Sequence, residues 1–174
     1  MKKFYTLFIL MITINALTTV NATAQASVVG HICAEVVEAL QASEVSPLNF
    51  GRFSPQVNSG GYIQVSPQGD RSVIGTVDLS TGTQNAGGFQ LTGAENAQFS
   101  ISLPTEPVLI TNNNTAKSML VTNWVSSPGQ GTGVGVLTNG MATVFIGATL
   151  VVGSMNENPT GTYSGTYTVT FDYN

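Results

Sequence analysis

The sequence is poor in charged residues, and it contains almost no histidine or cysteine. Charged side chains make up 8% of the 174 residues, and the chain has one cysteine, Cys33, and one histidine, His31. A single cysteine excludes an intrachain disulfide and leaves open a bridge to another molecule. A metal site needs three or four ligands, and His31 and Cys33 supply only two. We therefore expect no metal site.

The first residues have the features of a secretory signal peptide. Lys2 and Lys3 form a basic start, residues 4–16 are mostly apolar, and a small-x-small site ends at Ala26. The apolar stretch is shorter than the ~20 residues that a membrane-spanning helix needs. The pattern therefore predicts a signal peptide at residues 1–26 that is removed by cleavage.

Cleavage would leave one domain, residues 27–174, which is long enough to bury a core. Its strong bases are Arg52, Arg71 and Lys117, and they stand against nine Asp and Glu residues, so the net charge is −6. Nucleic-acid binding and anionic membranes both require basic patches. We expect no nucleic-acid partner and no membrane span after cleavage. The expected location is the periplasm, the cell surface or the extracellular space.

The sequence also lacks local signs of catalysis. The glycine-rich stretch "GQGTGVG", residues 129–135, matches neither the dinucleotide-binding nor the Walker spacing, and we interpret it as a flexible hairpin connection. The carboxylates are scattered along the chain. We therefore expect no catalytic residue and no cofactor. A hydrolase remains an alternative, because paired carboxylates can meet only in the fold.

Short runs of alternating apolar and polar residues, separated by glycine and proline, fill the rest of the chain and are typical of strands. The runs are residues 61–65, 71–79, 89–92, 98–103, 118–124, 141–152 and 161–174. The apolar residues within 34–42 also fit one face of a helix. We favour a strand there, because Val28, Gly30, Ile32, Ala34 and Val36 alternate as strand residues do. The pattern predicts an all-β antiparallel sandwich or barrel of about seven or more strands.

Aromatic residues on such a domain can form a carbohydrate-binding face. The candidates are Trp124, Tyr62, Tyr163, Tyr167 and Tyr173. In an alternating pattern, these side chains more often pack cores and cross-strand pairs. A glycan-binding β-sandwich module is therefore the first alternative to a structural role.

Five segments in fixed order resemble a known family. They are "PLNFGRFSP" at 47–55, "VSPQGDRS" at 65–72, "FSISLP" at 99–104, "FIGATLVV" at 145–152 and "GTYSGTYTVTFDYN" at 161–174. They resemble a bacterial secreted domain family of unknown function with an LNFG-type motif, which is distantly similar to chaperone–usher pilins and spore coat protein U. The resemblance implies an immunoglobulin-like, pilin-like sandwich and a secreted, non-enzymatic structural or adhesive role at the surface.

The pilin likeness also implies partners. It implies that a periplasmic chaperone, and then an identical or related subunit, pairs with the edge of the last strand. The segment that a neighbour would insert is residues 28–36, beside the strand around Val169. The implied contact residues are Val28, Ile32, Val36, Tyr167, Val169, Phe171 and Tyr173. The other hypothesis is that the N-terminal segment completes its own sheet.

Overall fold

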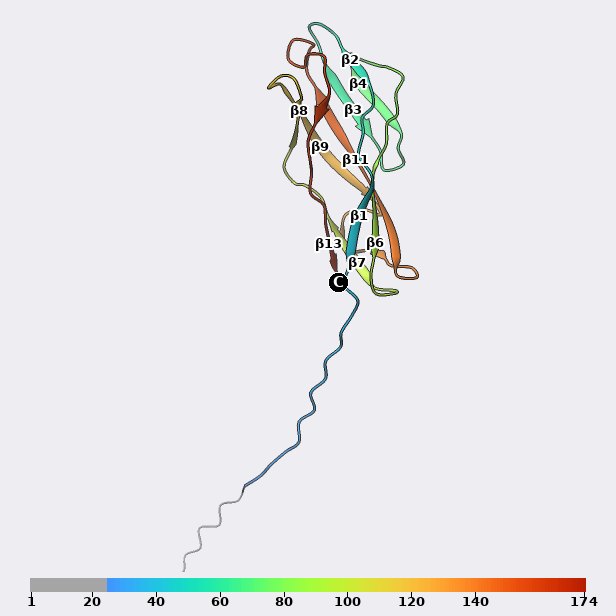
Figure 1. The fold of residues 1–174 in the computed structure, drawn as a ribbon, viewed down its shortest axis with the longest axis vertical. Helices are drawn as coiled ribbons and strands as arrows, with labels where there is room; N and C mark the ends of the chain where they lie inside the picture. Colours follow the sequence, from blue (N-terminus) through green and yellow to red (C-terminus); the bar gives the residue numbers. More distant parts are fainter. Residues whose placement is uncertain (1–24) are drawn as a thin grey trace, which may run out of the picture. The chain divides into compact units, whose positions relative to one another are not determined.

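The computed structural model describes residues 25–174, so all but the last two residues of the expected signal peptide lie outside it. In residues 25–174 the chain forms thirteen β-strands and no helix (Figure 1). All the strands belong to the compact unit that residues 36–174 form. In the described part of the chain, no helix has the length and apolar character to cross a membrane.

The strands form three antiparallel sheets. The large sheet contains β1 (Gln41–Ser46), β3 (Gly61–Val65), β4 (Arg71–Gly75), β6 (Gly87–Thr92), β8 (Val108–Asn112), β9 (Ser118–Ser127), β11 (Met141–Val152) and β12 (Tyr163–Ser164). A second sheet contains β7 (Gln98–Ser102), β10 (Gly131–Val136) and β13 (Thr170–Tyr173), and a third pairs β2 (Phe53–Pro55) with β5 (Val77–Leu79). The prediction of an all-β antiparallel, sandwich-like fold is confirmed.

Strand β11 is the centre of the large sheet, where it pairs with β3, β6 and β9. Its alternate residues Val144, Ile146, Ala148, Leu150 and Val152 are buried. Side chains of successive strand residues point to opposite faces, so β11 lays one continuous apolar row along the inner face of the sheet. That row runs through both hydrophobic clusters of the core.

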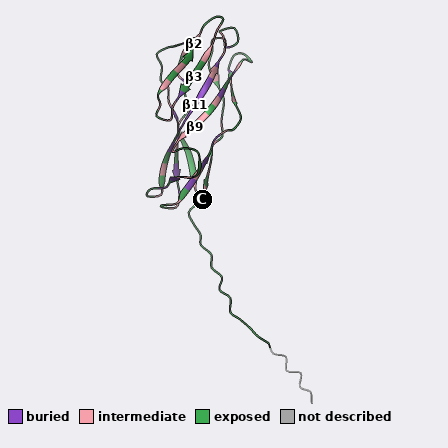
Figure 2. Cartoon of the chain, turned by 180° about the vertical axis from the view of Figure 1, so that it is seen from behind, coloured by how far each residue is buried: buried purple, intermediate pink, exposed green. Residues whose placement is uncertain are grey.

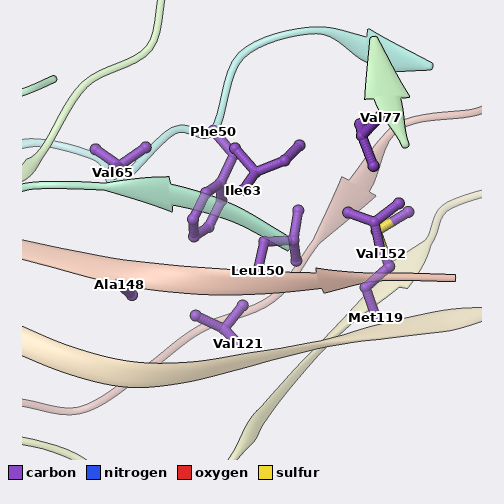
Figure 3. Close-up of a cluster of buried hydrophobic side chains, with 9 residues drawn as sticks. All are labelled: Phe50, Ile63, Val65, Val77, Met119, Val121, Ala148, Leu150 and Val152. Atoms are coloured by element: carbon purple, nitrogen blue, oxygen red, sulfur yellow. The ribbon is translucent and has the colours of Figure 1, made fainter. Parts of the chain in front are cut away.

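The two small sheets each cover part of the inner face and enclose one cluster. The first cluster (Figure 3) consists of Phe50, Ile63, Val65, Val77, Met119, Val121, Ala148, Leu150 and Val152. The second consists of Leu91, Phe99, Ile101, Leu103, Leu137, Val144 and Ile146. Trp124 is half-buried and packs against both clusters.

Two predicted strands are interrupted in the structure. Residues 71–79 form two strands, because Gly75 has a φ of +102° and turns the chain out of the large sheet before β5 begins. Thr76 holds this bend, since its N–H and hydroxyl both donate to the Gly60 carbonyl. The last run, residues 161–174, forms strand only at β12 and β13, and residues 165–169 have no register partner.

Two other interpretations were wrong. The strand favoured at residues 34–42 is present only at its end, because residues 25–40 form no strand or helix and the first strand, β1, begins at Gln41. Residues 28–36 are exposed (Figure 2). The glycine-rich stretch expected to be a connection contains strand β10, because Gly135 lets the backbone lie directly against the ring of Phe99.

Candidate functional site: a groove in the inner layer

The inner layer of the unit formed by residues 36–174 is divided into two separate small sheets. The two-stranded and three-stranded sheets share no pairing, and residues 165–169 form no strand between them. A groove of about 970 Å³ lies there, with residues 47–55 along one side and residues 158–167 along the other.

The floor of the groove is apolar. Val108 and Ile110 of β8, Met119 and Val121 of β9, and Leu150 of β11 line it. Met119, Val121 and Leu150 belong to the first hydrophobic cluster, and Val108 and Ile110 pack against it. The groove therefore leads directly to core side chains, and a partner placed in it would extend the first cluster.

One wall is the segment that carries the LNFG motif. Asn49 exchanges two backbone hydrogen bonds with Asn85, of 2.9 and 3.0 Å, and its side-chain Oδ1 accepts a 2.8 Å bond from the Gly51 N–H. These bonds shape a turn that points Phe50 into the first cluster, where it is buried. The motif thus has a structural role in this chain.

Arg71 fixes the same wall to the rest of the domain. Its Nη1 donates to the carbonyls of Phe50 (3.1 Å) and Arg52 (3.3 Å), and its Nη2 donates to the Ser80 carbonyl (3.2 Å). A planar guanidinium can bind several carbonyls at once in fixed directions. Arg71 therefore holds the wall segment at a constant distance from β4.

The opposite wall is held by a buried asparagine and a tyrosine. Asn158 Oδ1 accepts a 2.6 Å bond from the Gly153 N–H, and its Nδ2 donates to the Ser118 carbonyl at 3.0 Å. The hydroxyl of Tyr163 donates to the Pro159 carbonyl at 2.8 Å. These hydrogen bonds hold the wall in place as far as β12. The unpaired residues 165–169 follow directly after β12.

A stacked aromatic pair is part of the lining of the groove. The ring centroids of Trp124 and Tyr167 are 4.7 Å apart, with 29° between the ring planes. In the described residues, the buried atoms Trp124 Nε1, Tyr167 OH and Ser126 Oγ have no hydrogen-bond partner. Burial raises the pKa of Tyr167 to about 12, and the negative charge of Glu44 adds to this rise.

The structure places the predicted C-terminal contact residues together. Tyr167, Val169, Phe171 and Tyr173 are half-buried and pack against the second cluster. Phe171 pairs with Ile101 and Tyr173 pairs with Phe99 across β7 and β13. The Tyr173 hydroxyl accepts a 2.8 Å bond from the Ala94 N–H and donates a 2.9 Å bond to the Glu38 carbonyl. β13 is an edge strand, because it pairs only with β7.

The predicted N-terminal contact residues are exposed to solvent. Val28, Ile32 and Val36 are 94%, 98% and 97% exposed, and none of them belongs to a strand. His31 and Cys33 are exposed as well. Within residues 25–174, no group of three or more His, Cys, Asp and Glu side chains could hold a metal ion.

The sequence analysis missed one strand of the groove floor, β8. Strand β8 was not predicted, because its short run "VLITN" follows a proline, and its last residue begins a series of three asparagines, residues 112–114. The candidate aromatics do not gather on one open face. The close aromatic pairs of the described chain are Phe89–Tyr167, Phe89–Phe171 and Trp124–Tyr167, and they all contact the second cluster.

Comparison with known proteins gives one match. The model of a domain family described as "Domain of unknown function (DUF4402)" matches residues 40–173. The search of curated proteins gives no match, and the search of solved structures gives none either.

Proposed function

The chain belongs to the DUF4402 family, and we propose that it is an exported, non-enzymatic structural or adhesive subunit of the bacterial surface. In this proposal, each subunit receives a strand from another subunit in its groove, as the distant likeness to pilins implies. The observation that carries the proposal is the apolar groove next to the unpaired residues 165–169. Signal cleavage and transport to the periplasm or cell surface belong to the same proposal.

The backbone supports strand addition at this place. An unpaired strand edge presents N–H and C=O groups that another extended chain can bind. Residues 165–169 continue the line from β12 to β13 and have no register partner. An inserted strand would give these five residues a hydrogen-bonded neighbour and would cover the apolar floor.

The occupant is the N-terminal segment of a second copy or of a related subunit. Residues 28–36 alternate Val28, Gly30, Ile32, Ala34 and Val36 on one side, and as an extended strand they would span about 26 Å. Burying one large aliphatic side chain stabilises by about 1.5–3 kcal/mol. Three such side chains in the groove would offset a good part of the entropy cost of ordering the segment.

In this proposal, a periplasmic chaperone occupies the groove first, and the segment of the neighbouring subunit later replaces it. An apolar groove with an open edge exposes the subunit to uncontrolled association. A partner that pairs with the edge at β13 and covers the groove would keep the subunit monomeric until the exchange.

Peptide binding tests the proposal. The receiver is the mature chain carrying Ile32→Asp, whose own segment cannot insert, and the ligand is a synthetic peptide of residues 27–40. Trp124 is the only tryptophan and lines the groove, so its fluorescence reports occupancy. The wild-type peptide is expected to bind, and the peptide with Ile32→Asp is not.

The matched control is a peptide with Val29→Asp. Val29 lies on the opposite side of the extended segment from Ile32, so this peptide is expected to bind like the wild type. The proposal is wrong if all three peptides bind equally, or if none changes the fluorescence of Trp124 at millimolar concentration.

A further inference from the structure

The outer face of the large sheet carries a row of apolar side chains that crosses five strands. The register places Ile74 of β4 opposite Tyr62 of β3, Tyr62 opposite Val151 of β11, Val151 opposite Leu120 of β9, and Leu120 opposite Leu109 of β8. Ile74, Tyr62, Leu120 and Leu109 are 65%, 48%, 41% and 58% exposed. At about 4.8 Å between strands, this outer row is about 19 Å long.

The strands carry no charge on the outer face, and Glu157 lies at its border, where it lines one hollow with Tyr62 and Val151. The eight strands of the large sheet contain two charged residues, Glu44 and Arg71. Arg71 lies opposite the buried Val65, and Glu44 lies opposite Phe89, which packs against the second cluster. Both therefore belong to the inner face. The row beside the outer row is also neutral, and it contains Ser72, Gln64, Thr149 and Thr122.

We propose that this outer face binds the same face of a second copy of the chain. The chain is acidic, with a net charge of −4, so two copies repel each other over most of their surfaces. The strands of the outer face are neutral and apolar, and the negative charge of Glu157 at its border is partly offset by Lys117, so two copies can stack there with little repulsion. Exposed apolar patches of this kind mark interaction sites.

The outer row is suited to two-fold symmetry. An axis parallel to the strands and passing over Val151 would place Val151 opposite its own copy. The same axis would place Tyr62 opposite Leu120 and Ile74 opposite Leu109. Each contact then occurs twice, as an isologous interface requires, and the two sheets stack about 10 Å apart, as in a β-sandwich.

The size of the patch sets the strength of the contact. Five strands at about 4.8 Å spacing, over a shared length of about 17 Å, give a flat footprint of about 400 Å² per copy. Over both copies this is about 800 Å², which is smaller than standard specific interfaces and lies in the range of weak, transient contacts. The expected dimer is therefore weak and depends on protein concentration. It is independent of the proposed strand addition, because the groove lies on the inner face of the large sheet.

Sedimentation of the mature chain tests this inference. All variants carry Ile32→Asp, which removes strand insertion and leaves the outer face unchanged. The parent is expected to form dimers with rising concentration. Leu120→Glu is expected to raise the dissociation constant about thirty-fold or more, because it buries a charge at the centre of the interface.

The matched control is Val136→Glu, the same kind of change at an exposed strand residue of the three-stranded sheet. It should leave the dissociation constant within a factor of two. Ile74→Glu, at the edge strand β4, repeats the test if Leu120→Glu fails to fold. The inference is overturned if the parent stays monomeric at millimolar concentration, or if the row variants dimerise as tightly as the control. Failure of the peptide test would not change either result.

Discussion

Tyr167 stacks on Trp124, with a centroid distance of 4.7 Å, at the point where the two hydrophobic clusters meet. The pair lines the groove and links β9 to the unpaired residues 165–169. Its two polar atoms, Trp124 Nε1 and Tyr167 OH, are buried without partners. Packing of the two rings therefore stabilises the fold, whereas burial of their unpaired polar atoms destabilises it. Substitutions can separate the two effects.

Replacing Tyr167 with phenylalanine keeps the stack and removes the unpaired hydroxyl. A buried polar group without a partner costs about 1–3 kcal/mol, so the free energy of unfolding should stay constant or rise by about 1 kcal/mol. Tyr173→Phe is the control, because its hydroxyl bonds both Ala94 and Glu38, and it should lose about 1–2 kcal/mol. Urea unfolding measures both. Equal losses in the two variants would contradict the unpaired state of the Tyr167 hydroxyl.

Tyr167 should also lower the stability of the domain at alkaline pH. The pKa of Tyr167 is raised from 10.0 to about 12 by burial, with a smaller contribution from Glu44. The folded state thus holds this proton more tightly than the unfolded state, so its contribution is present below pH 10 and is lost as the pH rises to about 12. The stability of the wild type should fall more steeply over this window than that of Tyr167→Phe. The prediction is wrong if the free energy of unfolding, measured with urea, falls equally steeply with pH in the two proteins.

Arg71 should matter far more than the other arginine of the domain. Arg71→Gln removes hydrogen bonds to the carbonyls of Phe50, Arg52 and Ser80, and we expect a loss of about 1–3 kcal/mol. Arg52→Gln is the control, because the Arg52 side chain is exposed and should change stability by less than about 0.5 kcal/mol. Arg71→Lys should recover little, since an ammonium cannot bond three carbonyls in fixed directions. Thermal unfolding that ranks the two arginines equally would rule out this role.

The strands with strong apolar alternation could be predicted from the sequence. The bounds of β3 and β11 agree with the predicted residues 61–65 and 141–152, because buried apolar residues recur at every second position between clear turns. Most of β1 was missed, because the strand favoured at residues 34–42 overlaps it only at Gln41 and Ala42, and its first five residues are all exposed and give no apolar period. β10 was missed, because its three glycines are typical of a loop.

The groove could not be predicted, because it depends on pairing between distant parts of the chain. The sequence places Tyr167, Val169 and Phe171 in one alternating run, and these residues do share the core face. The run gives no sign that residues 165–169 lack a register partner. Whether a strand has a neighbour is decided by sheet order, and local periodicity does not contain that information.

Gly135 should be one of the least replaceable glycines of the domain. A Cβ at this position would overlap the ring of Phe99, which is fully buried in the second cluster and cannot move aside. Gly135→Ala should therefore cost about 1–3 kcal/mol through overpacking. Gly129→Ala is the control, because a Cβ there meets nothing within 4 Å, and its stability should stay within about 0.5 kcal/mol of the wild type. Combining Gly135→Ala with Phe99→Leu makes room for the methyl group, so the double variant should lose less than the sum of the two single losses. Strict additivity in urea unfolding would show that the ring of Phe99 does not set the cost.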